Sequence, residues 1–178
     1  MKLPWLKPSE ALNRPLNRQH DSLASSAALA QPEKIRRLGF HIGNIGLLIA
    51  QRTTSELTDV LPICQLPNTA AWLLGLINLR GNLVPVFDLN MLLELERVPD
   101  KRKRMLLILG QGELAGAILI DDLPIHITLS EEDKLESLPP LPTALKAFVS
   151  SGFEKNGELW FNFDHLGFFQ SLANQVPL

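Results

Sequence analysis

Short apolar runs separated by turn residues dominate the sequence from Ile35 onward. Runs such as MLLIL (105–109) and GAILI (116–120) are rich in leucine and isoleucine. Both are too short for a helix that builds a core, but their length is ordinary for a strand. Glycine, asparagine or proline follows most of the runs, and these residues favour turns. The pattern predicts a mainly β fold, either a barrel or a sandwich.

Three turn signals divide these runs into hairpins. The turn residues are Gly43 with Asn44, Gly110 with Gly112, and Asn156 with Gly157. Asn-Gly between two strand-like segments is the strongest two-residue hairpin signal in the chain. After the last hairpin, Asp164 is placed as the N-cap of a closing helix, HLGFFQSLAN. We also expect a strand in RTTSEL (52–57) and another in NLVPVFDL (82–89).

Two further helical segments are predicted between the strands. In NTAAWLLGLIN, Ala70, Leu73, Leu74 and Ile77 fall at helical spacing, and Asn68 is a possible N-cap. We therefore expect a short helix that ends near Gly75. A helical turn is also expected at 143–148, after a proline-rich connection.

The first 34 residues differ from the rest of the chain because they are rich in serine, alanine, asparagine and proline. We interpret 1–34 as an N-terminal extension that is partly helical or mobile, with one short helix after Ser9 and another in DSLASSAALAQ. The expected domain spans 35–173, and 174–178 form a tail. The full chain of 178 residues suits one domain or two small lobes with a shared core.

Composition excludes several classes of partner. The net charge is −2 and the pI is near 6.1, so no long-range field attracts nucleic acid. The basic run DKRKR (100–104) has no interleaved aromatic residues and is interpreted as a solvated loop. No apolar run approaches the roughly 18 residues of a spanning helix. With a single cysteine, Cys64, the chain is expected to be a soluble cytoplasmic protein that does not insert into membranes.

No catalytic, cofactor or metal site is expected. GQGELA (110–115) fits a dinucleotide-binding pattern, but no helix period follows it, so a hairpin turn is the better interpretation. The four histidines lie at 20, 41, 126 and 165, and none is four residues from another. Asp121 and Asp122 are adjacent on a strand end and point to opposite faces, so they cannot act as an acid/base pair. These absences favour a binding or scaffolding role.

LPNTAAWLLGLINLRGNLVPVFDLNMLL (66–93) resembles the signature of the CheW family of chemotaxis coupling proteins. The matching positions are Leu66, Pro67, Asn68, Gly75, Asn78, Leu79, Arg80, Gly81, Pro85, Asp88, Leu89, Leu92 and Leu93. AGAILIDDL resembles a further family strand, with Asp121 at its acidic position, and the last hairpin and helix are also similar. The resemblance covers about 36–173. The extension and the proline-rich segment look most like the PilI-type members of type IV pilus chemosensory systems.

The resemblance implies two intertwined five-stranded SH3-like β-barrels with short helices. It also implies a non-enzymatic adaptor that is recruited to membrane receptor arrays through its partners. These partners are the cytoplasmic tip of a methyl-accepting chemoreceptor and the regulatory domain of a CheA-type histidine kinase. The implied partner-binding residues are Thr54, Glu56, Leu57, Asn78, Arg80, Gly81 and Asp121. An alternative is a repurposed CheW-like scaffold whose extension binds pilus machinery or another regulator.

Arg80 is the residue that the turn between helix and strand leaves unexplained. We predict that Arg80 pairs with Glu56 across the fold, because a guanidinium holds a carboxylate in a fixed planar geometry. The alternative is an ordinary surface arginine in a turn, since exposed ion pairs contribute little.

Overall fold

The computed structural model describes residues 34–96 and 103–175. The expected extension up to residue 33, with its two helices, lies outside the described residues. So do most of the basic run and residues 176–178 of the tail.

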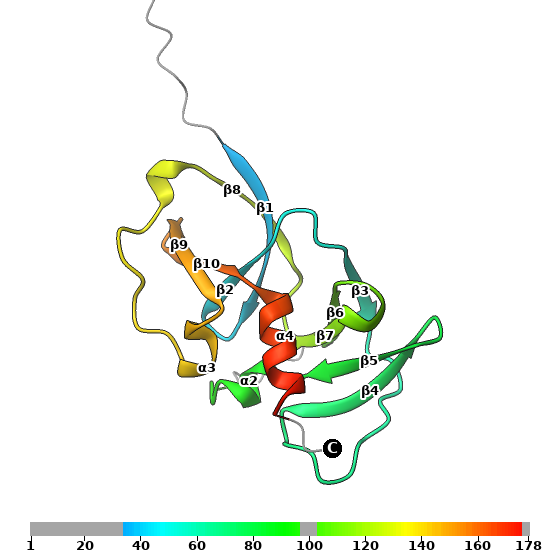
Figure 1. The fold of residues 1–178 in the computed structure, drawn as a ribbon. Helices are drawn as coiled ribbons and strands as arrows, with labels where there is room; N and C mark the ends of the chain where they lie inside the picture. Colours follow the sequence, from blue (N-terminus) through cyan, green and yellow to red (C-terminus); the bar gives the residue numbers. More distant parts are fainter. Residues whose placement is uncertain (1–33, 97–102, 176–178) are drawn as a thin grey trace, which may run out of the picture. The chain divides into compact units, whose positions relative to one another are not determined.

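Within the described residues, ten strands form two five-stranded sheets (Figure 1). The first sheet has the order β8-β1-β2-β10-β9 and comprises β1 (Ile35–Ile42), β2 (Ile45–Ile49), β8 (Ile125–Leu129), β9 (Val149–Lys155) and β10 (Glu158–Phe163). The second has the order β3-β6-β7-β5-β4 and comprises β3 (Ser55–Asp59), β4 (Leu73–Leu79), β5 (Asn82–Phe87), β6 (Met105–Leu109) and β7 (Gly116–Ile120). The mainly β prediction with two five-stranded units is confirmed.

The three predicted hairpins are present, with the expected residues at their turns. β1 pairs with β2, β6 with β7, and β9 with β10, each in antiparallel register. The segment GQGELA is the connection of the β6–β7 hairpin and contains a single 3₁₀ turn, η1 (Gly112–Leu114). The interpretation of this segment as a hairpin connection is therefore confirmed.

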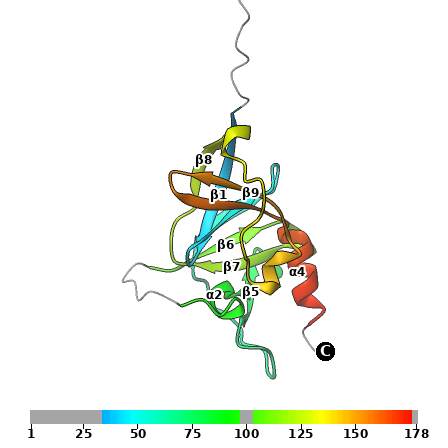
Figure 2. The same ribbon diagram turned by 90° about the vertical axis from the view of Figure 1, so that its left-hand side faces the viewer.

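The second sheet is inserted into the first along the chain. Its strands occupy 55–120 without interruption, whereas the first sheet combines β1 and β2 with three strands that follow residue 124. Each sheet contains one parallel pair, β2 with β10 and β5 with β7. Figure 2 shows β6 and β7 of the second sheet beneath β1 and β8 of the first. This arrangement is the predicted intertwining of two units.

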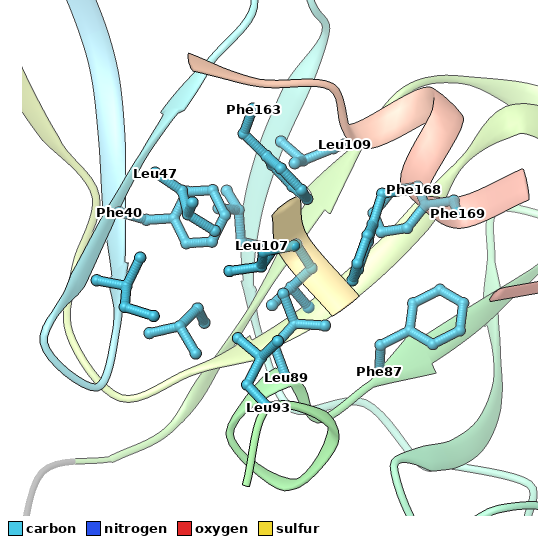
Figure 3. Packing of buried hydrophobic residues seen from close by; sticks show 14 of the residues in the cluster. Phe40, Leu47, Phe87, Leu89, Leu93, Leu107, Leu109, Phe163, Phe168 and Phe169 are labelled. Carbon is cyan, nitrogen blue, oxygen red and sulfur yellow. The ribbon is translucent and has the colours of Figure 1, made fainter. Parts of the chain in front are cut away.

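Buried side chains form three clusters. One lies within the second sheet and includes Val84, Val86, Leu106 and Ile108, and a smaller one within the first sheet is centred on Trp160. The largest combines residues of both sheets with the C-terminal helix. Its labelled members in Figure 3 are Phe40, Leu47, Phe87, Leu89, Leu93, Leu107, Leu109, Phe163, Phe168 and Phe169. The strand β6 is buried on both faces. Leu106 and Ile108 belong to the cluster within the second sheet, and Leu107 and Leu109 belong to the largest cluster, between the two sheets.

The predicted short helix, capped by Asn68 and ending near Gly75, is wrong, because the strand β4 begins at Leu73. Leu73 and Ile77 are buried, and their separation of four residues fits one face of a strand as well as one turn of a helix. Gly75 lies between them with φ +136°, and a Cβ atom there would clash with the carbonyl of Cys64. The backbone at Cys64 therefore packs tightly against the β4 backbone at Gly75, and this contact excludes a helix there.

Short helices join the strands and close the chain. Asp164 caps α4 (His165–Ala173) by accepting a hydrogen bond from the Gly167 N–H, as predicted. The expected helical turn at 143–148 is α3 (Thr143–Lys146). Two elements were not predicted from the sequence: α2 (Leu89–Leu92), which Asp88 caps, and the strand β8. No helix in the described part is both long and apolar enough to cross a membrane.

Candidate functional site

The turn between β4 and β5 places Arg80 in an unusual backbone conformation. Leu79 pairs with Asn82, so Arg80 and Gly81 are the two central residues of the hairpin turn. Both have positive φ, +52° and +90°, as in a type I′ turn. Asparagine and glycine are the favoured residues at the first position, and an arginine there is strained. The turn is supported by a hydrogen bond from the Gly81 N–H to Oδ1 of Asn78, at 2.8 Å.

The side chain of Arg80 forms the predicted pair with Glu56 of β3. Its Nη1 donates to Oε2 at 2.8 Å and its Nη2 donates to Oε1 at 2.7 Å. This two-bond geometry stabilises the charged guanidinium and raises the pKa of Arg80. The Arg80 side chain is 73% exposed and that of Glu56 is 33% exposed, so the pair is open to solvent on the arginine side. Such a pair fixes orientation more than it stabilises the fold.

The Arg80–Glu56 pair links the two edge strands of the second sheet. β3 lies at one edge of this sheet and β4 at the other, and no backbone ladder joins them. The second connection near the β4 edge is a bridge in which Cys64 and Leu76 exchange two backbone hydrogen bonds of 2.8 and 2.9 Å. A side-chain pair therefore closes the sheet at the Arg80 end, where backbone pairing does not.

A hollow of about 200 Å³ lies beside the pair. Thr54, Glu56 and Arg80 line it, together with Asn82 and Gln111, which were not among the predicted residues. The Thr54 carbonyl accepts a hydrogen bond from the Gly110 N–H at 3.0 Å, which brings the β6–β7 connection to this place. The antiparallel pairing of β3 with β6 was the signal that would have identified Gln111. We call this hollow and the Arg80–Glu56 pair the Arg80 site.

Leu57 and Asp121 lie apart from the Arg80 site. Leu57 follows Glu56 on β3, so its side chain points to the opposite face, where it is 39% exposed. Asp121 follows the end of β7, and its carboxylate accepts a hydrogen bond from Asn90 Nδ2 at 3.2 Å. It lines a separate pocket of about 530 Å³ that also contains His41 and Lys103. Of the seven predicted residues, five surround the β4–β5 turn and the start of β3.

Comparisons with known proteins agree with this architecture. The family described as the CheW-like domain matches residues 36–173. The protein PilI of Pseudomonas aeruginosa is 26% identical over 129 residues, which are 71% of this chain and 72% of PilI. The chemotaxis protein CheW of Helicobacter pylori is 25% identical over 137 residues, 77% of this chain and 81% of that protein.

A solved structure shows the same fold. The scaffolding protein TtCheW from Thermoanaerobacter tengcongensis superposes with a TM-score of 0.59 at 19% identity, over 75% of this chain and 90% of that one. The match to the family covers both sheets, the β4–β5 turn that carries Arg80, and helix α4. The chain therefore belongs to the CheW-like domain family.

Proposed function

We propose that this protein is a non-enzymatic adaptor that couples chemoreceptors to a CheA-type histidine kinase, in chemotaxis or in twitching motility. Its partners are the cytoplasmic tip of a methyl-accepting receptor and the regulatory domain of the kinase. The adaptor then acts in the cytoplasm, at membrane receptor arrays. Membership of the CheW-like domain family and the similarity to PilI and CheW proteins support this proposal. Residues 35–173 carry the coupling function in this proposal.

The Arg80 site is the observation that supports a binding role most directly. Its arginine occupies a turn position that favours asparagine or glycine, and Glu56 fixes the direction of its guanidinium. The two bonds to Glu56 use two of the five N–H donors of an arginine side chain. A carboxylate or carbonyl of a partner can therefore bond to the same exposed guanidinium. Local strain combined with a fixed, exposed side chain is typical of a functional position.

A binding experiment with both partners tests the proposal. The full chain is mixed with the kinase regulatory domain and with a receptor signalling tip, separately and together, and binding is measured by isothermal titration calorimetry. We expect binding to each partner and a three-component complex on size exclusion. Micromolar affinity is sufficient, because transient signalling interfaces are small. If the chain binds neither partner, the proposal is wrong.

A further inference from the structure

The turn between β9 and β10 carries an asparagine–glycine pair that has no part in the Arg80 site. Lys155 pairs with Glu158, so Asn156 and Gly157 are the two central residues of this turn. Their φ angles are +55° and +81°, which fit a type I′ turn. Both residues are exposed. The pair that forms the hairpin, drawn in orange in Figure 1, is therefore also open to water.

The carboxamide of Asn156 is not held by the surrounding fold. Among the described residues it has no hydrogen-bond partner, whereas Asn162 on β10 donates to Oγ of Ser151 at 2.7 Å. On the other side of the peptide bond, no atom lies within 4 Å of the place where a Cβ of Gly157 would be. The side chain of Asn156 and the backbone that follows it are thus free to rearrange whenever the turn opens.

An asparagine that precedes a glycine can lose ammonia without an enzyme. The backbone nitrogen of Gly157 attacks Cγ of Asn156, so a new N–Cγ bond forms and the Cγ–Nδ2 bond breaks. Ammonia leaves and takes the proton of the Gly157 nitrogen with it, and a cyclic succinimide remains. Water then opens this ring at either carbonyl, which gives aspartate or isoaspartate. Water is the co-reactant, and nothing is oxidised or reduced.

The residue after the asparagine decides which asparagines can react. A side chain on that residue crowds its backbone nitrogen, and glycine has none. Asn156 is the only asparagine in the sequence that precedes a glycine. Asn44 and Asn174 are also exposed, but they precede Ile45 and Gln175. The chain therefore offers one favourable site, together with exposed asparagines that serve as internal controls.

The conformation of the turn controls access to this reaction. In a type I′ turn, the mirror image of type I, ψ of the first central residue is about +30°. This angle points the Gly157 nitrogen away from the side chain of Asn156, whereas ring closure needs the nitrogen and Cγ on the same side. Beyond the turn the next pair in the ladder is Glu154 with Leu159. The ring can close only when the end of this hairpin opens, and local openings of this kind cost less than global unfolding.

We propose that Asn156 is a site of spontaneous deamidation and that opening of the β9–β10 turn sets its rate. The folded turn slows the reaction, and each opening exposes the asparagine–glycine pair to ring closure. The product accumulates with the age of the molecule, because hydrolysis does not restore the amide. The inference does not depend on the coupling function, since it uses only the chemistry of this turn.

The isoaspartate product disturbs the hairpin more than the aspartate product. Isoaspartate carries the main chain through its side-chain carbonyl, which adds a methylene to a turn of two residues. Phe153 pairs with Trp160 further along the hairpin, and Trp160 is buried in the cluster of the first sheet. Either product also places a carboxylate next to Lys155, which already binds Asp133 at 2.8 Å. The aged protein should therefore be less stable.

The test follows Asn156 in the full chain, folded in buffer or unfolded in urea, at neutral pH and physiological temperature. Trypsin releases a C-terminal fragment that contains Asn156 together with Asn162 and Asn174. Mass spectrometry locates the change, and a protein isoaspartate methyltransferase serves as the probe for isoaspartate. We expect conversion at Asn156 in the folded chain and at neither of the other two. Conversion should be at least about tenfold faster in urea, because the unfolded chain reaches the ring-closing geometry more often.

Two variants separate the parts of the proposal. Gly157→Ala should slow conversion in urea at least about tenfold, since a methyl group crowds the attacking nitrogen even where no turn exists. Asn156→Asp introduces the charge without the extra methylene and suits a type I′ turn. Its unfolding temperature should therefore lie above that of the isoaspartate form isolated from aged protein.

Three results would overturn the inference. One is an unchanged Asn156 in the folded chain over the time in which the unfolded chain converts. Another is conversion of Asn174 at the same rate, which would show that exposure and not the glycine decides. The third is an equal rate in buffer and in urea, which would remove the control by the turn.

Discussion

Arg80 combines an unfavourable backbone conformation with a well-oriented side chain. The turn that it occupies would form more readily with asparagine, whose short side chain tolerates positive φ. In exchange, the guanidinium reaches Glu56 on the opposite edge strand and stays largely exposed. A position that lowers local stability and presents a charged group is expected where binding, rather than folding, selects the residue.

Arg80→Lys is the first prediction at the residue scale. Lysine keeps the positive charge but loses the planar two-bond contact with Glu56. We expect binding to the kinase domain or to the receptor tip to weaken about tenfold, with little change in unfolding temperature. Lys134→Ala is the matched control, since Lys134 is an exposed cation paired with Glu131 elsewhere in the fold. Equal binding by Arg80→Lys would show that the two-bond geometry has no specific role.

Arg80→Asn separates the turn from the side chain. It should retain or slightly increase the unfolding temperature, because asparagine suits the positive φ at this turn. Partner binding should fall at least as far as with lysine. Thermal unfolding and calorimetry on the same preparation measure both effects. A large loss of stability would instead assign Arg80 a structural role.

His165 predicts a loss of stability in mild acid. Burial lowers its pKa, and its Nδ1 has no hydrogen-bond partner among the described residues. The unfolded chain therefore binds a proton more readily than the folded one, so stability should fall as the pH drops below about 6.5. Denaturant unfolding between pH 7.5 and 5 measures this slope. The slope should flatten in His165→Phe, which keeps a ring against Phe169.

Asp133 predicts a second loss of stability at lower pH. Hydrogen bonds from Lys155 and from Ser130 lower its pKa to about 2. A lowered carboxyl pKa stabilises the folded state above the ordinary value near 3.8, and this contribution disappears as the pH falls through about 2. Asp133→Asn should remove this part of the acid transition. An unchanged acid transition in that variant would contradict the prediction.

At the scale of single elements, hairpins could be predicted from the sequence, whereas strands that depend on contacts with distant segments could not. Hairpins were recognised because glycine and asparagine mark turns in any tertiary context. The segment at 73–79 was misassigned because buried residues four apart fit both a helix and a strand. The deciding contact, Cys64 against Gly75, joins residues that no local pattern connects. The strand β8 was missed because its outward residues break the apolar run.

Gly75→Ala tests the packing of β4 directly. A Cβ atom would clash with the Cys64 carbonyl, and φ of +136° is strained for any other residue. We expect a loss of at least about 2 kcal/mol in the free energy of unfolding. Gly112→Ala is the matched control, since Gly112 has φ of +58° but open space around its Cα. Its loss should be near 1 kcal/mol, the cost of left-handed backbone alone.

The candidate site was predictable only in part, because some of its contacts join segments that are distant in the sequence. The pairing of Arg80 with Glu56 was expected, and the structure confirms it. Asn82 and Gln111 were missed because their proximity depends on how two hairpins meet. Asp121 was grouped with the turn residues, but strand register carries it to the other end of β7. Residues within one turn can be predicted from local sequence. The full set of residues on a surface also depends on how the strands pair, which local sequence does not show.

At the scale of the whole molecule, the domain proposal makes a separate prediction. If 35–173 carry the coupling function, a chain without residues 1–34 should bind the kinase domain and the receptor tip with unchanged affinity. Calorimetry on the full and shortened chains measures this. A partner that binds the full chain but not the shortened one would support the alternative in which the extension contacts pilus machinery or another regulator. Loss of kinase or receptor binding would contradict the proposed boundary.

The insertion of one sheet into the other also determines the order in which the protein can fold during synthesis. The second sheet is complete once residue 120 has left the ribosome, but β2 waits for its partner β10 near the end of the chain. Until then, the apolar β2 has an open edge to which other chains can bind. A ribosome that stalls between these points would release a protein with one finished half and one half prone to aggregation.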